Sequence, residues 1–484
     1  MNNGNLKILF LVQILIYFPI RFIAQDNTMY MLNQLPQANM LNPAVDFPCK
    51  MYIEIPVFSS IKFAYNNSSF TYKDFIRQGI GDGADSLVMD FDNIYDKLRK
   101  NNAIRVQAEN VLLGAGFHWK KYFISARVYQ SNHAGVFYNK DLVALKDGNW
   151  NPLTDLPVHF DLKRNEVNEI SCLGISLGIS KQFSNELRLG VRLNYLKGMM
   201  NFNTRKSDLS LVTSEQTVTV NVSSDYEVNA SFPMEYERDS AGYIHSISPI
   251  FNNFLSNYIF NKNRGLAIDF GFVYDFRENI KFSASVKNLG FIRWKSNSIN
   301  LKANNSINLV GVDLEQYANN QNTDLFELLI DTITNSFHFT DTPTKYFTAL
   351  PVDLFVGGTY RINNKLIVGL VGKLYLFNYA TFPTLTATIN IKPTSFINLT
   401  GSISLANRTI KNLGFAIITG NEQFNFYFVT DMLPINYVKD VKTGILFPYQ
   451  SKSFNFRFGV NLLFGCWNYK KVSFGPVCPA YQAY

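Results

Sequence analysis

Charged residues occur at alternate positions in several segments whose pattern predicts β-strands, and these are the side chains that could act on a ligand. Arg188 and Arg192, for example, alternate with leucines and a valine, so they project from the face opposite the apolar one. The residues selected in this way are Arg188, Arg192, Asp269, Lys287, Asp353, Lys373 and Arg457. If the strands close into a barrel whose apolar face points outward, this set lines the lumen.

Two interpretations of the lumen set are open. In the first, salt bridges and hydrogen bonds fill the interior, because buried charge is tolerated only when it is matched or hydrated. A barrel of medium size also needs its interior filled or plugged. In the second, the residues line a permeation path, and their basic majority favours anionic solutes.

No pattern in the chain predicts an enzyme. The five histidines are scattered without the spacing of metal ligands. The glycine-rich stretch Gly79–Gly83 is neither a phosphate-binding loop nor a dinucleotide fingerprint. The sequence contains no serine elbow and no HExxH pair. We therefore predict no catalytic residue, no metal site and no cofactor.

The elements that position the lumen set are short strands with a period of two. In the last fifth of the chain, Phe424, Phe426 and Phe428 alternate with Asn425 and Tyr427. Such alternation over several residues is typical of a strand with one apolar face. The same pattern predicts 14 strands: Met51–Tyr65, Ile104–His118, Phe123–Tyr138, Glu169–Gln182, Leu187–Phe202, Leu266–Phe276, Lys281–Ile292, Phe347–Ile362, Leu366–Phe377, Leu385–Ile391, Phe396–Leu405, Leu413–Thr419, Phe424–Thr430 and Phe454–Gly465.

The connections between these strands differ systematically. Tight polar turns alternate with a second set of connections, most of them long, so the two kinds fall on opposite sides of the sheet. Outer-membrane barrels show this asymmetry, with short periplasmic turns and longer extracellular loops. We predict an all-β fold: a transmembrane antiparallel β-barrel over residues 51–465, with short helices in its extracellular loops. Outer-membrane lipid is then its first partner.

Composition and the start of the chain agree with this location. Aromatic residues make up 15% of the chain and charged residues only 17%, against a usual charged fraction of about 25%. Lys7, the apolar run Ile8–Ile16 and Ala24 predict an export signal over residues 1–24. The net charge of +8 is too diffuse to indicate a nucleic-acid partner.

Three long connections carry helical patterns. They lie in Asp85–Lys100, after Ser248 and Pro249, and after Thr323 and Asp324. Their apolar faces either pack together over the barrel mouth or form a surface for an apolar ligand or a partner protein. A further loop strand near Thr217–Val222 is left open.

The two ends of the mature chain carry separate predictions. Residues 25–50 have no strand pattern, and they form either a periplasmic tail or a segment that folds into the lumen as a plug. Residues 466–484 form a C-terminal periplasmic tail. Cys466 and Cys478 flank that tail, and they either form a disulfide in the oxidising compartment or remain as thiols.

Several motifs resemble an outer-membrane family of Bacteroidota that is known only as a domain of unknown function. They are Met31–Ala44, Val286–Trp294, Gly401–Arg408 and Phe456–Gly465. The opening around Asn42 and Pro43 resembles, more weakly, PorP/SprF-like proteins of type IX secretion and gliding. The strand number resembles that of FadL-like transporters of hydrophobic compounds, whose N-terminal segment plugs the lumen.

The FadL-like resemblance implies a plug formed by Gln34, Pro36, Asn39, Asn42 and Pro43. It implies no biochemical activity, because a fold does not define a function. Our first hypothesis is a barrel that binds or passes small hydrophobic or amphipathic molecules across the outer membrane. The alternative is a non-enzymatic docking barrel whose partners are proteins of a secretion or cell-surface assembly.

Overall fold

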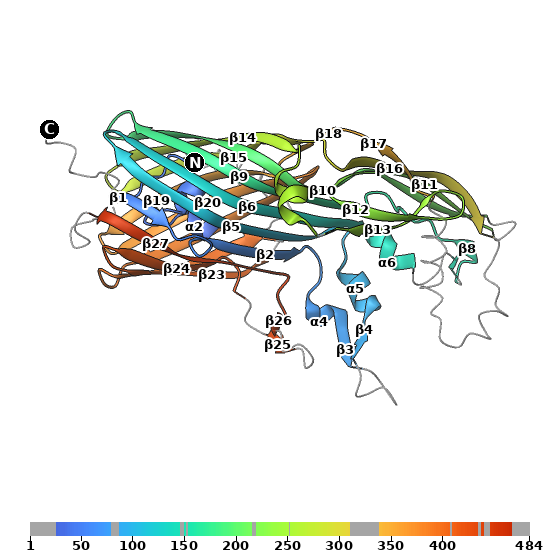
Figure 1. Ribbon diagram of the computed structural model, residues 1–484. Coiled ribbons are helices and arrows are strands. Elements are labelled where there is room, and N and C mark those ends of the chain that lie inside the picture. Colours follow the sequence, from blue (N-terminus) through green and yellow to red (C-terminus); the bar gives the residue numbers. More distant parts are fainter. Residues whose placement is uncertain are drawn as a thin grey trace, which may run out of the picture.

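The computed structural model describes residues 26–466, apart from 79–86, 146–149, 152, 215–218, 251, 310–337, 407–408, 434–436 and 440–445. Its main body is a closed antiparallel barrel of 14 strands (Figure 1). In order around the barrel these are β1 (Cys49–Glu54) with β2 (Ile61–Asn67), β5 (Asn101–Trp119), β6 (Tyr122–Asn139), β9 (Glu166–Gln182), β10 (Leu187–Thr213), β14 (Arg264–Arg277), β15 (Ile280–Trp294), β18 (Tyr346–Ala349) with β19 (Val352–Asn363), β20 (Leu366–Phe377), β21 (Ala380–Ile391), β22 (Ile397–Ala406), β23 (Thr409–Gly420), β24 (Phe424–Thr430) and β27 (Ser453–Cys466). Each strand pairs with its neighbours, and β27 returns to β1 and β2.

The predicted number and order of strands are confirmed, whereas some boundaries were wrong. The barrel begins at Cys49 rather than Met51, and β21 begins at Ala380 rather than Leu385. The connection expected over 378–384 is therefore a turn of Asn378 and Tyr379. It was missed because Pro383 interrupts the local pattern, although Pro383 still lies opposite Leu374 in the ladder.

The two faces of the strands separate as their alternation predicts. In β10 the side chain of Leu193 is 60% exposed and points outward, whereas its neighbour Arg192 is 3% exposed and points inward. Large apolar side chains on the outer face include Leu113, Phe117, Leu177, Phe270, Leu289, Val356, Leu370, Ile403 and Phe426. An outward apolar band around a polar interior is the arrangement of an outer-membrane barrel.

A disulfide joins the first and last strands. Cys49 of β1 lies directly opposite Cys466 of β27, and the two sulfur atoms are bonded. Cys466 therefore neither pairs with Cys478 nor remains a thiol, the two alternatives left open by the sequence, because closure of the barrel brings Cys49 beside it. Cys478 itself lies outside the described residues.

The first barrel strand is interrupted between β1 and β2. Residues 55–60 lie opposite only Gly459 and Val460 of β27. Phe58 is exposed on the outside, whereas Ser59 and Ser60 are fully buried inside. A Cβ atom on Gly459 would lie 2.0 Å from the carbonyl oxygen of Ser59, so only glycine leaves room for this inward backbone.

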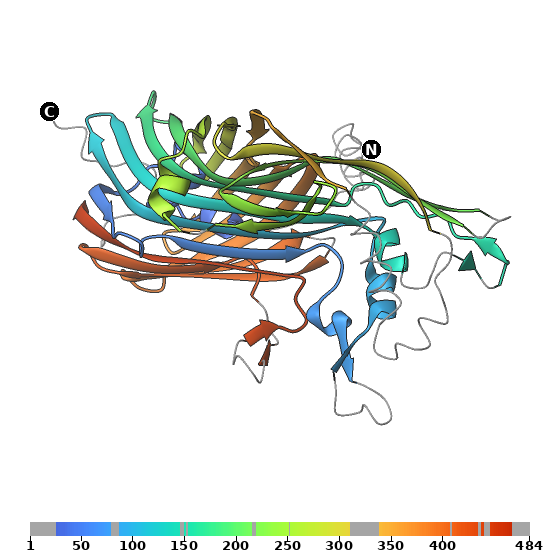
Figure 2. The ribbon, with the colours of Figure 1, turned by 45° about the vertical axis from the view of Figure 1, so that its right-hand side comes forward.

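Part of the barrel sheet, here called the projecting sheet, extends beyond one end of the barrel (Figures 1 and 2). The distal half of β10 continues past the barrel and pairs with β11 (Val220–Ser231), which pairs with β16 (Ser298–Leu309). A short strand, β17 (Thr340–Pro343), pairs with β16. The sequence left undecided whether a loop strand lies near Thr217–Val222. The structure has such a strand, β11, which begins at Val220.

The hairpin β12 (Met234–Arg238) and β13 (Ile244–Pro249) lies near this projecting sheet. Phe232 and Ile244 share an apolar cluster with Val228, Ile299 and Leu301. The helix predicted after Ser248 is therefore wrong at its start: Ser248 pairs with Glu235 in the hairpin, and a single π-helical turn, η3 (Leu255–Ile259), follows later. Strand pairing overrides the local capping signal there.

The other predicted loop helices have different outcomes. In the first connection the helix α5 (Phe91–Lys97) is shorter than predicted, because Asp90 caps its start and Leu87 lies in a strand. The helix expected after Thr323 lies outside the described residues. The long connections between barrel strands also contain α4 (Tyr72–Phe75), β3 (Ile76–Gln78), β4 (Leu87–Met89), α6 (Lys140–Ala144), β7 (Trp150–Asn151), β8 (Leu156–Pro157), β25 (Tyr437–Lys439) and β26 (Leu446–Pro448). Among the described residues no helix is long and apolar enough to cross a membrane.

Candidate functional site in the barrel interior

The N-terminal segment, residues 26–48, lies inside the barrel (Figure 1). It contains two short helices, α2 (Asn27–Tyr30) and α3 (Ala38–Leu41), whose residues are all buried. Met29, Leu35 and Leu41 pack in a cluster with side chains of β19, β20, β23 and β24. The ring of Tyr30 stacks on that of Phe355, with 4.7 Å between their centroids. The segment thus fills the lumen with apolar as well as polar contacts.

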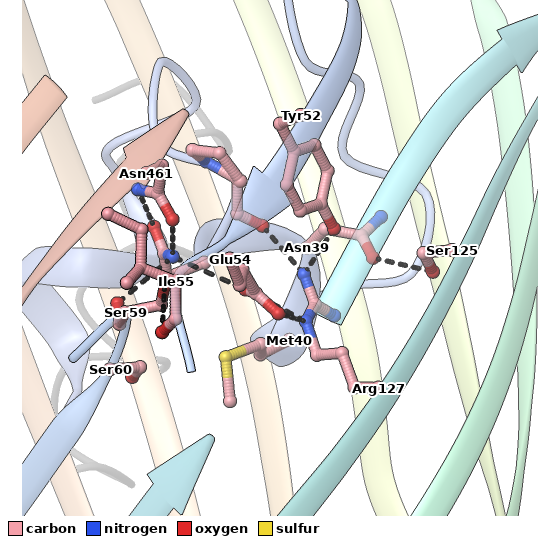
Figure 3. A network of polar contacts seen from close by, with 12 residues as sticks. Asn39, Met40, Tyr52, Glu54, Ile55, Ser59, Ser60, Ser125, Arg127 and Asn461 are labelled. Carbon is pink, nitrogen blue, oxygen red and sulfur yellow. Dashed lines mark hydrogen bonds and ion pairs between the residues drawn. The ribbon is translucent and has the colours of Figure 1, made fainter. Parts of the chain in front are cut away.

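Gln37 joins this segment to the first and last barrel strands. Figure 3 shows Glu54, Arg127 and Asn461 of the surrounding network. Its amide donates to Asn461 Oδ1 at 2.5 Å and accepts from Asn461 Nδ2 at 3.0 Å. It also donates to Glu54 Oε1 at 3.3 Å and to the carbonyl of Ser59 at 3.2 Å. The interrupted first strand is therefore held from inside by the N-terminal segment.

Arg127 completes this network. Its Nε lies 3.0 Å from Glu54 Oε2, and its NH2 donates to Tyr52 at 2.6 Å and to the carbonyl of Pro36 at 3.2 Å. The ion pair is almost fully buried, with side-chain exposures of 2% and 0%. Removing one partner of such a pair leaves an unmatched buried charge, which costs about 3–5 kcal/mol.

Asn39 connects the segment to the far wall of the barrel. Its Oδ1 accepts from Arg192 at 2.7 Å, and its Nδ2 donates to the carbonyl of Val45 at 2.9 Å. Arg192 also donates to the carbonyl of Met40 and lies 3.3 Å from Asp269 Oδ2. The predicted lumen residues Arg192 and Asp269 are thus paired with each other.

Two facing glycines receive the turn at Asn42 and Pro43. Gly190 of β10 lies directly opposite Gly271 of β14. A Cβ atom on Gly190 would lie 2.4 Å from the carbonyl carbon of Pro43, and one on Gly271 would lie 2.2 Å from Asn42 Oδ1. The missing side chains form a notch in the wall in which the N-terminal segment is seated.

Asp26 lies at the centre of a second charge network. It is 2.5 Å from Lys62 Nζ and 3.3 Å from Arg457 NH2. Arg457 also lies 3.0 Å from Glu109 Oε1, and Lys287 lies 3.3 Å from Glu109 Oε2. These contacts join strands from both sides of the lumen to the beginning of the described chain.

The remaining predicted lumen residues are also paired. Lys373 lies 2.9 Å from Asp353, and Arg188 forms an ion pair with Asp46 of the N-terminal segment. Burial alone would raise the pKa of Asp46, but the charge of Arg188 and a hydrogen bond with His118 hold this pKa below its usual range. The other predicted plug residue, Gln34, accepts a hydrogen bond from Asn398 at 2.6 Å.

The sequence interpretation missed several interior charges. Lys62, Glu109 and Arg127 are buried on the inner face of their strands. The alternation that selected Arg192 and Lys287 also runs through Ile104–His118 and Phe123–Tyr138, so the same signal was available for Glu109 and Arg127. Lys62 alternates with Ile61 and Phe63 in Met51–Tyr65. Glu54 also alternates with Ile53 and Ile55 in Met51–Tyr65, whereas Asp26 had no such signal because it lies outside the alternating segments.

Between the projecting sheet and the N-terminal segment, the inner wall is apolar and aromatic. One cluster joins residues of β5, β9, β10, β14, β15 and β18 to those of β20 and β21, and it comprises Ala103, Ile170, Cys172, Leu196, Ala267, Ile292, Trp294, Tyr346, Leu350, Tyr375, Phe377 and Phe382. We call this set the upper lumen cluster. Here opposite walls touch: His133 of β6 hydrogen-bonds Tyr375 of β20 at 3.0 Å, and Phe137 packs against Phe377.

No group of histidine, cysteine and acidic residues in the described part of the chain is placed to hold a metal ion. The interior thus offers apolar contact at the upper lumen cluster and polar contacts around the N-terminal segment.

Comparisons with known proteins add a family and a fold. The model of a family of unknown function, DUF5723, matches residues 43–431. No curated protein matches the sequence.

Several solved outer-membrane structures are similar in fold. The Pseudomonas putida toluene transporter TodX shares 9% identity over 87% of this chain and 91% of its own, with a TM-score of 0.36. The Ralstonia pickettii toluene transporter TbuX shares 11% over 89% and 94%, with a TM-score of 0.39. A Pseudomonas aeruginosa FadL homologue shares 10% over 92% and 100%, with a TM-score of 0.37. At such identities the similarity concerns the fold alone.

Proposed function

The chain belongs to the DUF5723 family, a family of unknown function, and from its interior we propose that it binds small hydrophobic or amphipathic molecules and passes them across the outer membrane. The observation that carries this proposal is the upper lumen cluster, an apolar and aromatic part of the barrel interior that lies beside the N-terminal segment. Apolar side chains concentrated in a concave interior are typical of sites for small apolar ligands.

The N-terminal segment has the role of a plug in this proposal. Its contacts reach β1, β6, β10, β15, β21, β22 and β27. A ligand that enters from the long-loop end would meet the upper lumen cluster first and this segment next. Passage would then require the segment, or the interrupted first strand beside it, to move.

The paired charges support a filled interior rather than a path for anions. Each of the seven predicted lumen residues has an acidic or basic partner among the described residues. A matched network presents little net charge to a solute, so it offers no selectivity for hydrophilic anions.

Ligand binding can be measured on the purified protein in detergent with naphthalene as the probe. We expect the wild type to bind naphthalene, and Phe377→Ser to weaken binding about 10- to 100-fold, because a buried phenylalanine contributes about 1.5–3 kcal/mol of apolar contact. The matched control is Phe415→Ser on the lipid-facing side of β23, which should leave affinity unchanged. Absence of naphthalene binding to the wild type would overturn the proposal.

The plug is tested separately by conductance in planar bilayers. Deleting residues 26–47 keeps Cys49 and β1, and it should raise ion conductance because the main filling of the lumen is removed. A deleted variant that retains its heat-modifiable mobility on gels, a sign of a folded barrel, but conducts no more than the wild type would contradict the plug role.

The projecting sheet favours a second candidate function, docking of a partner protein in a secretion or surface assembly. One edge of β16 pairs with β11 along its whole length. Its other edge pairs with β17 at residues 299–302 only, and the rest of that edge has no neighbouring strand among the described residues. Such an edge can accept a further strand. Crosslinking in native outer membranes tests this candidate, and a barrel that is isolated without a stoichiometric companion would reject it.

A further inference from the structure

Arg105 of β5 is a buried cation without a hydrogen-bonding partner among the described residues. Its side chain is 1% exposed, and Nε, NH1 and NH2 all lack a hydrogen bond. The other lysines and arginines of the interior described above, Lys62, Arg127, Arg188, Arg192, Lys287, Lys373 and Arg457, each have an acidic partner within 4 Å. Buried polar groups are nearly always satisfied, so an arginine with three free donor atoms needs an acceptor from elsewhere.

Asn66 of β2 lies directly opposite Arg105 in the ladder. It is also 1% exposed, and neither its Nδ2 nor its Oδ1 has a hydrogen-bonding partner among the described residues. Cross-strand neighbours have their Cβ atoms about 4.5–5.5 Å apart, so both side chains can reach one ligand group. On the other side of Arg105 lies Gly135, which leaves space for the arginine stem.

The guanidinium lies in the upper lumen cluster. Its Cζ is 3.7 Å from the centroid of the Phe382 ring and 5.2 Å from that of Tyr375, on the opposite side of the barrel. A guanidinium that packs on an aromatic ring still presents the N–H groups at its edge, which suit a planar carboxylate. The acidic residue Asp353 does not fill this role, because it pairs with Lys373 at 2.9 Å.

We propose that Arg105, assisted by Asn66, recognises the single negative charge of a ligand whose apolar body packs on the upper lumen cluster. The ligand class is thus a monoanion, such as a carboxylate, with an apolar or aromatic body. This inference rests on the proposed function and specifies its substrate. The carboxylate accepts hydrogen bonds from Arg105 and Asn66, while the ligand's apolar body contacts residues such as Phe382.

The test compares 2-naphthoate with naphthalene, two probes that differ by one carboxylate. The wild type should bind 2-naphthoate more tightly than naphthalene. Arg105→Met should weaken 2-naphthoate about 10- to 100-fold, as expected for hydrogen bonds to a charged group, and leave naphthalene unchanged. Arg105→Lys keeps the positive charge but not the planar guanidinium with its several donors, so its affinity for 2-naphthoate should be intermediate.

The matched control is Arg293→Met. Arg293 also packs over a phenylalanine, with 5.2 Å to the Phe347 ring, but it lies on the outer face. It should change neither affinity. Thermal unfolding gives an independent readout: Arg105→Met should be as stable as the wild type or more stable, because the substitution removes an unmatched buried charge. A large loss of stability would indicate a structural role for Arg105 and overturn the inference.

The remaining outcomes separate this inference from the proposed function. If the wild type binds neither probe, the proposed function fails. If it binds both equally, or if Arg105→Met binds 2-naphthoate like the wild type, only the recognition of charge fails, and the donors are satisfied by water. Asn66→Leu tests the same site independently, with an expected loss of about 2- to 10-fold for 2-naphthoate only.

Discussion

Replacing Gly271 by alanine should loosen the N-terminal segment from the barrel wall. A Cβ atom at this position would lie 2.2 Å from Asn42 Oδ1 and 2.5 Å from the backbone nitrogen of Ala44. Both distances are far below van der Waals contact, so the turn at Asn42 must shift. Overpacking of this kind costs about 1–3 kcal/mol.

The shift would also weaken the hydrogen bonds of Asn42. Its Nδ2 donates to Tyr30 and to the carbonyl of Phe272, both at 3.2 Å, and its Oδ1 accepts from Ala44 at 2.9 Å. Losing one of these contributes roughly another 1 kcal/mol. We therefore expect the free energy that holds the segment in place to fall by about 2–4 kcal/mol.

Hydrogen–deuterium exchange measures this free energy directly. Amides of residues 26–48 should exchange about 30- to 1000-fold faster in Gly271→Ala, since about 1.4 kcal/mol corresponds to a factor of ten. The control is Gly401→Ala, where the nearest atom to an added Cβ is 3.5 Å away. Equal exchange in the wild type and both variants would refute the notch as the seat of the segment.

Three further predictions concern the rest of the barrel. Cys49→Ala should lower stability to denaturant unfolding by about 2–5 kcal/mol, because the disulfide that ties the first strand to the last is lost; wild type treated with reductant should match it. Asp46→Asn should be less stable than the wild type at neutral pH, and this difference should shrink as the pH falls below about 4. The pKa of Asp46 is lower in the folded than in the unfolded protein, so its carboxylate stabilises the fold above the unfolded-state pKa, and this stabilisation is lost as the pH falls through the folded-state pKa. A pH-independent difference would contradict the ion pair with Arg188. Leu193→Arg should cost about 2–4 kcal/mol in lipid and Leu193→Val much less; equal losses would argue against a lipid-facing side chain.

The alternation of side chains was sufficient to predict the strands and their faces. The outward position of Leu193 and the inward position of Arg192 follow from a period of two, which depends only on the local geometry of an extended chain. For the same reason Arg105 and Arg127 could have been selected from their strands. Boundaries such as Ala380 were harder to predict, because the ends of strands depend on pairing with neighbours.

Residues without a long periodic run were not predictable in this way. Ser248 carries a helix-capping signal, but its place in the hairpin depends on Glu235 and on the packing of Phe232 near the projecting sheet. Local signals of this kind contribute about 1 kcal/mol, so strand pairing and burial override them.

Sequence alone thus established the fold class, the number of strands and the side of each strand that faces lipid, since these are properties of local periodicity. Only the closed barrel established which charges meet: Glu109 with Lys287, 178 residues apart, and Cys49 with Cys466, 417 apart. Such partners come together only when the last strand returns to the first. Arg105 illustrates the same limit. Among the described residues it has no hydrogen-bonding partner and packs against an aromatic wall, and both facts depend on the opposite side of the barrel.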